Sequence, residues 1–224
     1  MKIVSFSGID GAGKTTQISA FDSWLKQVGQ RTTQLAFWDD IVVFPRFREF
    51  LSHKAFKGDQ GVGSPDQPLV RRDKNVTSRP VIAMRFCLYF GDAVNLWLKI
   101  RRLKKTNWDV VIFDRYIYDE LANLPLNHWM SRLFVRLVTS FIPKPDVAYV
   151  IDADPEAAFA RKPEYPLEFL RSNRNAYLTL GRLTGNVTII EPLPIEAAAK
   201  KIREAFLSQF SNADTRLFEL PATH

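Results

Sequence analysis

The chain has 224 residues, of which 46% are hydrophobic and 25% charged, and this composition excludes a disordered or fibrous protein. A single cysteine excludes an intrachain disulfide and fits a reducing compartment such as the cytoplasm. The net charge of +7 and the pI of about 9.6 favour anionic partners, for which phosphorylated small molecules and nucleic acids are the candidates.

The segments that target a protein to a membrane or a nucleic acid are not expected here. Met1 and Lys2 lead directly into an apolar run, which differs from a signal peptide, and we find no apolar stretch of the roughly 20 residues that cross a bilayer. The basic cluster Lys99–Lys105 has no interleaved aromatic residues, so we interpret it as a solvated helix end. We therefore expect a cytoplasmic protein with no membrane or nucleic-acid partner.

Short apolar runs of strand length alternate along the chain with longer segments of helical periodicity. In chain order we predict strand Lys2–Ser7, helix Lys14–Val28, strand Arg31–Phe37, helices Phe47–Phe56 and Val81–Leu103, strand Trp108–Phe113, helix Leu124–Phe141, strand Asp146–Ile151, helices Pro155–Ala160 and Leu167–Leu183, strand Asn186–Ile190 and helix Pro194–Phe210. This alternation predicts a three-layer α/β/α fold with a central parallel sheet.

One segment interrupts the alternation. Residues 57–80 hold three glycines and three prolines without periodicity, so we expect a loop or a flexible insertion there. With no repeat and no domain boundary in the sequence, residues 1–224 are predicted to form a single domain, with a tail from Ser211 onward that frays.

A phosphate-binding loop follows the first predicted strand. Residues Gly8–Thr15 satisfy the pattern G-x-x-x-x-G-K-[ST] in full, with a strand before them and an amphipathic helix after them. Glycines allow backbone N–H groups to surround a triphosphate, Lys14 reaches its β and γ phosphates, and the Thr15 hydroxyl is a Mg²⁺ ligand. The predicted ATP-binding residues are Gly8, Asp10, Gly11, Ala12, Gly13, Lys14, Thr15 and Thr16.

A second charged motif closes another strand. The apolar run Trp108–Phe113 ends in Asp114, where a P-loop fold carries the carboxylate that holds Mg²⁺ or its water. Arg115 follows at once, and its fork of N–H groups matches the oxygens of a transferring phosphoryl group. The alternative for Arg115 is a salt bridge to a neighbouring acid.

Three segments together resemble the thymidylate kinases, a family of P-loop nucleoside monophosphate kinases. They are Phe6–Gln17, the triplet Asp114-Arg115-Tyr116, and Pro145–Arg161, with weaker similarity continuing to Tyr177. The resemblance implies Mg²⁺-dependent transfer of the γ-phosphoryl group of ATP to a nucleoside monophosphate, dTMP being the expected acceptor. It also implies a short helical lid at about residues 161–174 and a homodimer.

The resemblance also assigns roles to individual residues. Asp10 contacts the sugar of the acceptor, Arg115 bridges the donor and acceptor phosphates, and Arg48 holds the acceptor phosphate. Arg161 is the first candidate for a catalytic lid arginine, followed by Lys162, Arg171 and Arg174. Tyr89 stands where the family carries an aromatic residue that stacks on the base, although it can equally fill the core.

The acceptor half departs from the family pattern. Ala93 stands where an arginine reads the base, Phe37-Trp38-Asp39-Asp40 replaces Arg-Glu-Pro-Gly-Gly, and Ile117-Tyr118-Asp119-Glu120 replaces a small polar run. Two alternatives therefore stay open: a related kinase with a different small acceptor, and an ATP-binding regulatory protein without transfer. A hydroxyl acceptor would need a general base, for which Asp10, Asp39 and Asp40 are candidates.

Overall fold

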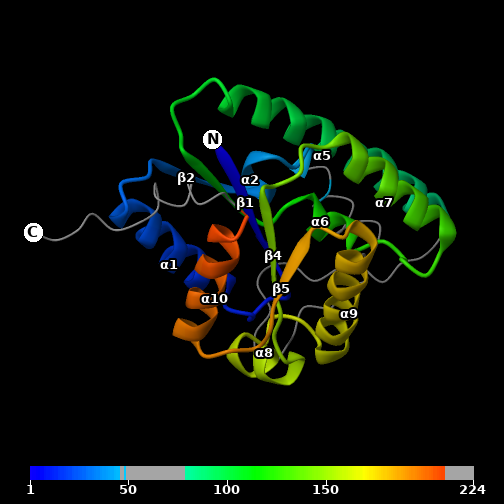
Figure 1. Cartoon of the computed structure of the whole chain (residues 1–224). Coiled ribbons are helices and arrows are strands. Elements are labelled where there is room, and N and C mark those ends of the chain that lie inside the picture. The colour runs from blue at the N-terminus through cyan, green and yellow to red at the C-terminus, as the bar shows by residue number, and fades with distance from the viewer. Residues whose placement is uncertain (46–47, 49–78, 210–224) are drawn as a thin grey trace, which may run out of the picture.

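Five parallel strands form one central sheet in the computed structural model, which describes residues 1–45, 48 and 79–209. The strands are β1 (Lys2–Ser7), β2 (Thr32–Ala36), β3 (Val110–Asp114), β4 (Val147–Ile151) and β5 (Val187–Ile190), in the spatial order β2-β3-β1-β4-β5. Every neighbouring pair runs parallel, which confirms the predicted parallel sheet (Figure 1).

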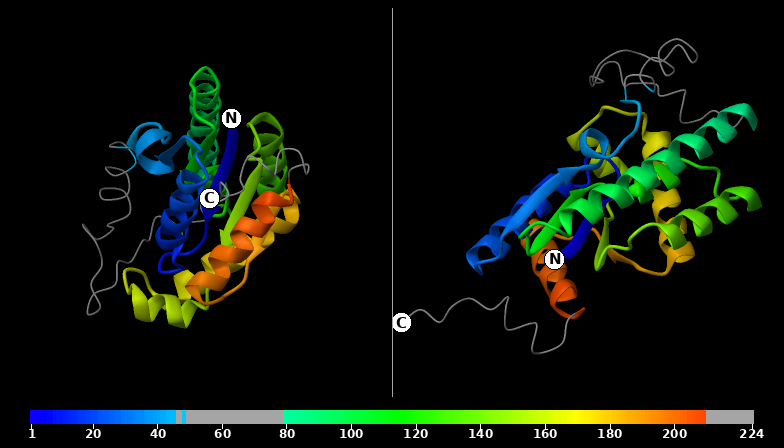
Figure 2. Two further views of the ribbon diagram at one scale, coloured as in Figure 1. Left: turned by 60° about the vertical axis from the view of Figure 1, so that its left-hand side comes forward. Right: turned by 90° about the horizontal axis from the view of Figure 1, so that it is seen from above.

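Helices cover both faces of the sheet, as Figures 1 and 2 show. They are α1 (Lys14–Gln27), α2 (Phe37–Asp40), α5 (Arg79–Leu103), α6 (Ile117–Leu121), α7 (Trp129–Phe141), α8 (Pro155–Arg161), α9 (Leu167–Thr184) and α10 (Ile195–Leu207). Helices α1 and α10 pack on one face, and α5, α6, α7 and α9 pack on the other. The three-layer α/β/α fold is therefore confirmed.

Alternating apolar side chains on each strand fill two separate cores. On β3, Val110 and Ile112 contact the core under α1 and α10, whereas Val111 and Phe113 contact the opposite core. Successive side chains of a strand point to opposite faces, so a strand buried on both sides must be apolar throughout. This requirement explains the apolar runs of β3 and β4, while β1 also buries the two small serines Ser5 and Ser7.

Several predicted boundaries differ from those in the structure, and the cause is clear at two of them. The strand predicted to reach Phe37 ends at Ala36, because Phe37 begins the short helix α2. The helix predicted from Leu124 begins only at Trp129, after a turn closed by the hydrogen bond from the His128 amide to the Pro125 carbonyl (2.9 Å). The five-residue helix α6 was not predicted.

Some predictions concern residues outside the described part of the chain. The helix predicted over Phe47–Phe56 contributes only Arg48, and the insertion predicted at residues 57–80 contributes only Arg79 and Pro80, which begin α5. The frayed tail predicted from Ser211 also lies beyond the described residues.

Helix α5 overturns one expectation about membranes. Within the described residues, Pro80–Leu103 is long and apolar enough to cross a bilayer by length and composition, and 28% of its most apolar window is buried. This is weak evidence for a membrane, because core helices pass the same test. Helix α5 buries Ala93, Leu96 and Ile100 in the core and lies beside α7, where Phe86 and Phe134 stack with ring centroids 4.3 Å apart.

The turn between β1 and α1 depends on glycines at two close approaches. Gly8 and Gly11 have φ angles of 141° and 80°, in the region that L side chains rarely adopt. A Cβ atom on Gly8 would lie 2.5 Å from the carbonyl oxygen of Ile151, and one on Gly11 would lie 2.4 Å from that of Ala158. The loop can therefore lie against the end of β4 and against α8 only if positions 8 and 11 carry no side chain.

Gly29 provides a matched control for this steric requirement, because its φ of 79° equals that of Gly11 within a degree and a Cβ there would meet nothing within 4 Å. Gly11→Ala should lower the free energy of unfolding by about 1–3 kcal/mol more than Gly29→Ala, since only Gly11 adds a clash to the backbone strain. Urea denaturation of both variants measures the difference. Equal losses in the two variants would contradict the packing described here.

Candidate functional site

The loop Gly8–Gly13 lies at the carboxyl edge of the sheet, where open α/β sheets bind ligands. Phe6, two residues before the loop, pairs in register with Asp114 at the end of β3. The loop leads directly into α1, whose first turn contains Thr15 and Thr16. The backbone N–H groups and the helix N-terminus, which attract anions, therefore lie at the same edge of the sheet as the Asp114 carboxylate.

Lys14 is a buried cation held inside the loop. Its ammonium group donates to the carbonyl oxygens of Gly8 (3.0 Å) and Ile9 (2.9 Å) and lies 3.9 Å from the Asp10 carboxylate. Burial, together with the nearby Arg115 cation, lowers the Lys14 pKa from 10.5 to about 8, although Asp10, Asp119 and Asp114 oppose the shift. A phosphate would restore the lost solvation of this charge.

Arg115 reaches the same loop from β3. Its guanidinium bonds the Asp10 carboxylate through one terminal nitrogen and Asp119 Oδ1 through the other (3.0 Å). Burial alone would lower the Arg115 pKa, but the attraction of Asp119 and Asp10 raises it, so the group is a permanent cation. The salt-bridge alternative for Arg115 is thus also present, since both terminal nitrogens contact carboxylates.

Arg115 adopts an unusual backbone conformation. Its φ is 68°, and Phe44 is the other non-glycine residue with positive φ in the part of the chain that the structure describes. The Arg115 amide donates to the Phe6 carbonyl (2.9 Å), which anchors the turn on β1. Strained conformations of this kind persist where the surroundings enforce them and occur often at functional sites.

Two oxygen groups at this edge suit a magnesium ion bound together with a triphosphate. Thr15 is exposed in the first turn of α1. Asp114 is partly exposed, and its charge is near enough to Lys14 to oppose the lowering of the Lys14 pKa. Among the described residues, no group of three or more His, Cys, Asp or Glu side chains could hold a metal alone. One or two protein oxygens with substrate phosphates is the usual arrangement for Mg²⁺.

Arg48, the predicted acceptor-phosphate ligand, is bound to the protein itself. One terminal nitrogen lies 2.7 Å from both carboxylate oxygens of the fully buried Asp92, and another lies 3.6 Å from Glu120 Oε1. Burial raises the Asp92 pKa, while Arg48 opposes the shift. The carboxylate of Asp92 thus holds the Arg48 side chain against α5.

Tyr89 and Ala93 lie on the buried side of α5. The Tyr89 side chain is 5% exposed and its ring lies under the Arg48 guanidinium, 6.0 Å from the ring centroid. Ala93, which replaces the expected base-reading arginine, is fully buried in the same core. Arg85, one turn before Tyr89, is also buried and donates to the Asn123 carbonyl (3.3 Å). The sequence offered no reason to single out Arg85.

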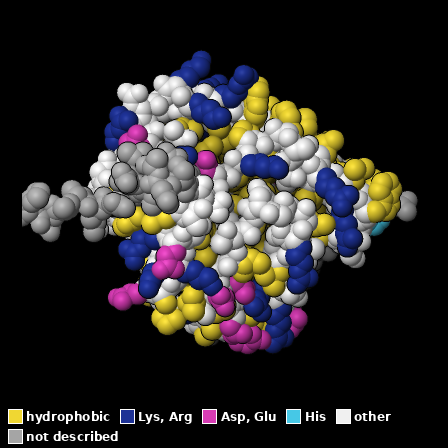
Figure 3. Space-filling view, viewed as in Figure 1, with side chains coloured by type: hydrophobic (Ala, Val, Ile, Leu, Met, Phe, Trp, Pro, Cys, Tyr) yellow, Lys and Arg dark blue, Asp and Glu magenta, His cyan; other side chains and the backbone are white. Residues whose placement is uncertain are grey.

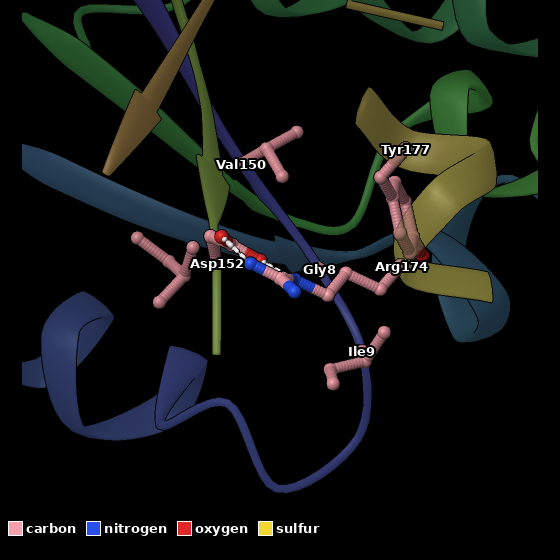
Figure 4. A pocket seen from close by; sticks show the side chains of 7 residues that line it. Gly8, Ile9, Val150, Asp152, Arg174 and Tyr177 are labelled. Carbon is pink, nitrogen blue, oxygen red and sulfur yellow. Dashed lines mark hydrogen bonds and ion pairs between the residues drawn. The ribbon is translucent and has the colours of Figure 1, made fainter. Parts of the chain in front are cut away.

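The segment predicted to form a lid contacts the site through Arg174. Its guanidinium makes two bonds of 2.6 Å to the Asp152 carboxylate, and both residues line a small pocket with Gly8, Ile9 and Tyr177 (Figure 4). This pair fixes α9 to the end of β4, directly beside the start of the loop. Among Lys162, Arg171 and Arg174, the structure therefore brings Arg174 beside the Gly8–Gly13 loop.

The other lid cations lie farther out on the surface. Arg161 is exposed at the end of α8, Lys162 pairs with Glu164 (3.1 Å), and Arg171 pairs with Glu156 and Glu168. Acidic side chains gather toward the lower end of the molecule in Figure 3, the end that carries α8. The net positive charge of the chain is thus locally balanced beside the lid.

Asp119 is a charged residue of the site whose role the sequence did not reveal. It lies in α6 and accepts hydrogen bonds from residues near the loop and in α9. The sequence showed only that an acid stands where a small polar run was expected.

The parallel sheet, the loop Gly8–Thr15 and the cations that converge on it define the chain as a P-loop phosphotransferase. No family model matches the sequence. The chain is 30% identical over 186 residues to a probable thymidylate kinase of Pyrobaculum aerophilum, covering 80% of this chain and 82% of that protein.

Other relatives match over nearly the full length. A probable thymidylate kinase of Methanothermobacter thermautotrophicus is 28% identical over 216 residues, covering 92% of this chain and 95% of that protein. A thymidylate kinase of Prochlorococcus marinus is 25% identical over 222 residues, covering 94% and 98%. The chain belongs to the thymidylate kinase family and thus to the nucleoside monophosphate kinases.

The lowered pKa of Lys14 predicts a pH-dependent affinity for ATP. As the pH rises through about 8, Lys14 in the free protein loses its proton, so the ATP affinity should fall, at most about tenfold per pH unit. Isothermal titration between about pH 7 and about pH 9.5 measures this change. Lys14→Ala should bind more weakly and without this fall above pH 8, and constant affinity in the unchanged protein would contradict the assignment.

Proposed function

We propose that this protein transfers the γ-phosphoryl group of Mg·ATP to dTMP. The observation that carries the proposal is the convergence of Lys14, Asp10 and Arg115 at the glycine loop, where the segment after β1 and the turn after β3 are joined by hydrogen bonds. Two cations beside a nest of N–H groups suit a transition state whose charge is spread over the equatorial phosphoryl oxygens.

In the proposed reaction the loop N–H groups and Lys14 hold the β and γ phosphates of ATP. Arg115 neutralises charge on the transferring group, and Asp10 orients Arg115 and the sugar of the acceptor. Thr15 and Asp114 would hold magnesium, which supplies charge neutralisation on the phosphate oxygens when bound. Residues 161–174 serve as the lid, whose Arg161 moves in as water is excluded.

The contacts of the candidate bases support a phosphate acceptor. Asp10 accepts a hydrogen bond from Arg115, and Asp40 accepts from the Ala36 amide (3.0 Å) and from Lys99 (3.2 Å). Each of these carboxylates would have to give up an ion pair before it could accept a proton from an acceptor hydroxyl. A monophosphate brings an ionised oxygen and needs no base, whereas a hydroxyl acceptor needs one.

The choice of dTMP rests on the family and on Tyr89, since Ala93 lacks the expected base contact. Arg48 would have to exchange Asp92 for the acceptor phosphate, a change of partner that a dianion can drive. A homodimer and a cytoplasmic location stay predictions. The apolar side chains that α7 exposes, Trp129, Leu133 and Leu137, support the homodimer.

The test is ADP production from Mg·ATP with dTMP, dUMP, UMP, CMP, AMP, GMP or the matching nucleosides. We expect dTMP to give the largest stimulation, and Lys14→Ala and Arg115→Ala to lower kcat/KM by about 10²–10³-fold each, because each removes a cation from the transition state. Lys26→Ala is the matched control, since Lys26 lies on the same helix, pairs with Asp22 and is 61% exposed.

Two outcomes would contradict the proposal. Strong stimulation by another acceptor alone would reassign the substrate, and Ala93 would then mark the altered base site. Tight ATP binding without stimulation by any acceptor would indicate a regulatory nucleotide-binding protein instead. In both cases Lys26→Ala should behave as the unchanged protein does.

A further inference from the structure

The Asp119 carboxylate is a buried charge that the proposed reaction does not use. Its side chain is 4% exposed and accepts four hydrogen bonds. The donors are Ser7 Oγ (2.6 Å), the Tyr177 hydroxyl (2.6 Å), Arg115 Nη1 (3.0 Å) and the Tyr116 amide (3.1 Å). A carboxylate is stable at such a depth only when donors satisfy it from several sides.

These donors come from three separate parts of the fold. Ser7 ends β1 and directly precedes the loop, Arg115 and Tyr116 form the turn after β3, and Tyr177 lies in α9. Tyr177 follows Arg174 by three residues, so both side chains extend from one face of α9 toward the loop (Figure 4). The Asp119 carboxylate is therefore hydrogen-bonded to the residue before the loop, to Arg115 and to α9 at once.

Arg115 is held by carboxylates at both ends of its fork. Asp10 accepts from one terminal nitrogen and Asp119 accepts from the other, so the plane of the guanidinium is fixed. A planar fork that is already oriented loses little freedom when a phosphoryl group arrives. Removing either carboxylate would leave a long side chain, on a backbone with φ of 68°, free to turn away.

Tyr177 connects this arrangement to α9. Burial and the neighbouring Asp119 charge raise its pKa well above 10, so the hydroxyl stays a hydrogen-bond donor. Its bond to the same Asp119 oxygen that accepts from Arg115 makes the carboxylate orientation depend on where α9 lies. A shift of α9 would thus be felt at the Arg115 guanidinium.

We propose that Asp119 is a positioning residue that aligns Arg115 for phosphoryl transfer and, through Tyr177, couples that alignment to α9. The inference rests on the proposed function, because it assumes that Arg115 acts on the transferring group. In this chain Asp119 stands within a segment where the family resemblance predicts small polar residues.

The direct test uses Asp119→Asn and Tyr177→Phe. Each should lower kcat by about tenfold to hundredfold, because misplacing a catalytic group by an ångström has an effect of that size. The KM for ATP should change by less than about threefold, since Lys14 and the loop stay in place. Tyr118→Phe is the matched control: Tyr118 is equally buried, and its hydroxyl contacts Asn186 (3.1 Å). It should leave kcat unchanged.

A double-variant cycle separates positioning from general structural support. If Asp119 acts through Arg115, Asp119→Asn should lower kcat by less than about twofold in an Arg115→Ala background. Independent, multiplying effects would overturn the proposal while leaving the proposed function intact. Unchanged kcat in Arg115→Ala would overturn both.

Circular dichroism and ATP affinity identify variants that fail to fold. Should Asp119→Asn unfold, Tyr177→Phe carries the test alone, because it removes one hydroxyl and leaves the carboxylate paired. A kcat for Tyr177→Phe equal to that of Tyr118→Phe would then overturn the coupling to α9.

Discussion

Two like charges, Lys14 and Arg115, are buried together beside the same loop, and the rest of the site is arranged to make that possible. Each cation loses solvation and repels the other, which lowers the Lys14 pKa to about 8. Asp10 lies between them, within 3.9 Å of Lys14 and in contact with Arg115. Asp119 neutralises Arg115 from the other side. The result is a cationic site that an anion of high charge would stabilise.

This constraint separates the donor half of the site from the acceptor half. The donor half follows from local geometry, because a strand, a glycine loop and a helix N-terminus in sequence create an anion site wherever they occur. The residues expected to bind the acceptor depend on tertiary packing instead, and among them Arg48 is paired with Asp92 of α5. Membership of the family is thus compatible with acceptor-side residues that differ from the family pattern.

The sequence predicted the parts of the structure that depend on short-range order. Short runs of strand length located all five strands within two residues, and the spacing of Gly8–Thr15 located the loop, because both signals lie in contiguous residues. Helix α6 was missed because five residues are too few to show a period. The sequence predicted helix α5, but it gave no sign that the charged side chains of Arg85 and Asp92 would be buried, as they are in the structure.

Asp119 shows why the remainder of the site could not be predicted. Its hydrogen bonds reach Ser7 and Tyr177, which are 112 and 58 residues away in the chain. No local pattern encodes such contacts, which arise only when β1, α6 and α9 pack together. Arg48 shows the same limit, since the family resemblance implied a phosphate ligand and could not show that the fold pairs its guanidinium with Asp92.

The measurement that tests the central claim most directly is the fate of the γ-phosphoryl group. Mg·ATP labelled at the γ position would be incubated with dTMP and the protein, and the products separated. The account predicts that the label appears in dTDP in a one-to-one ratio with ADP. Label released only as inorganic phosphate, at a rate that dTMP does not change, would contradict it.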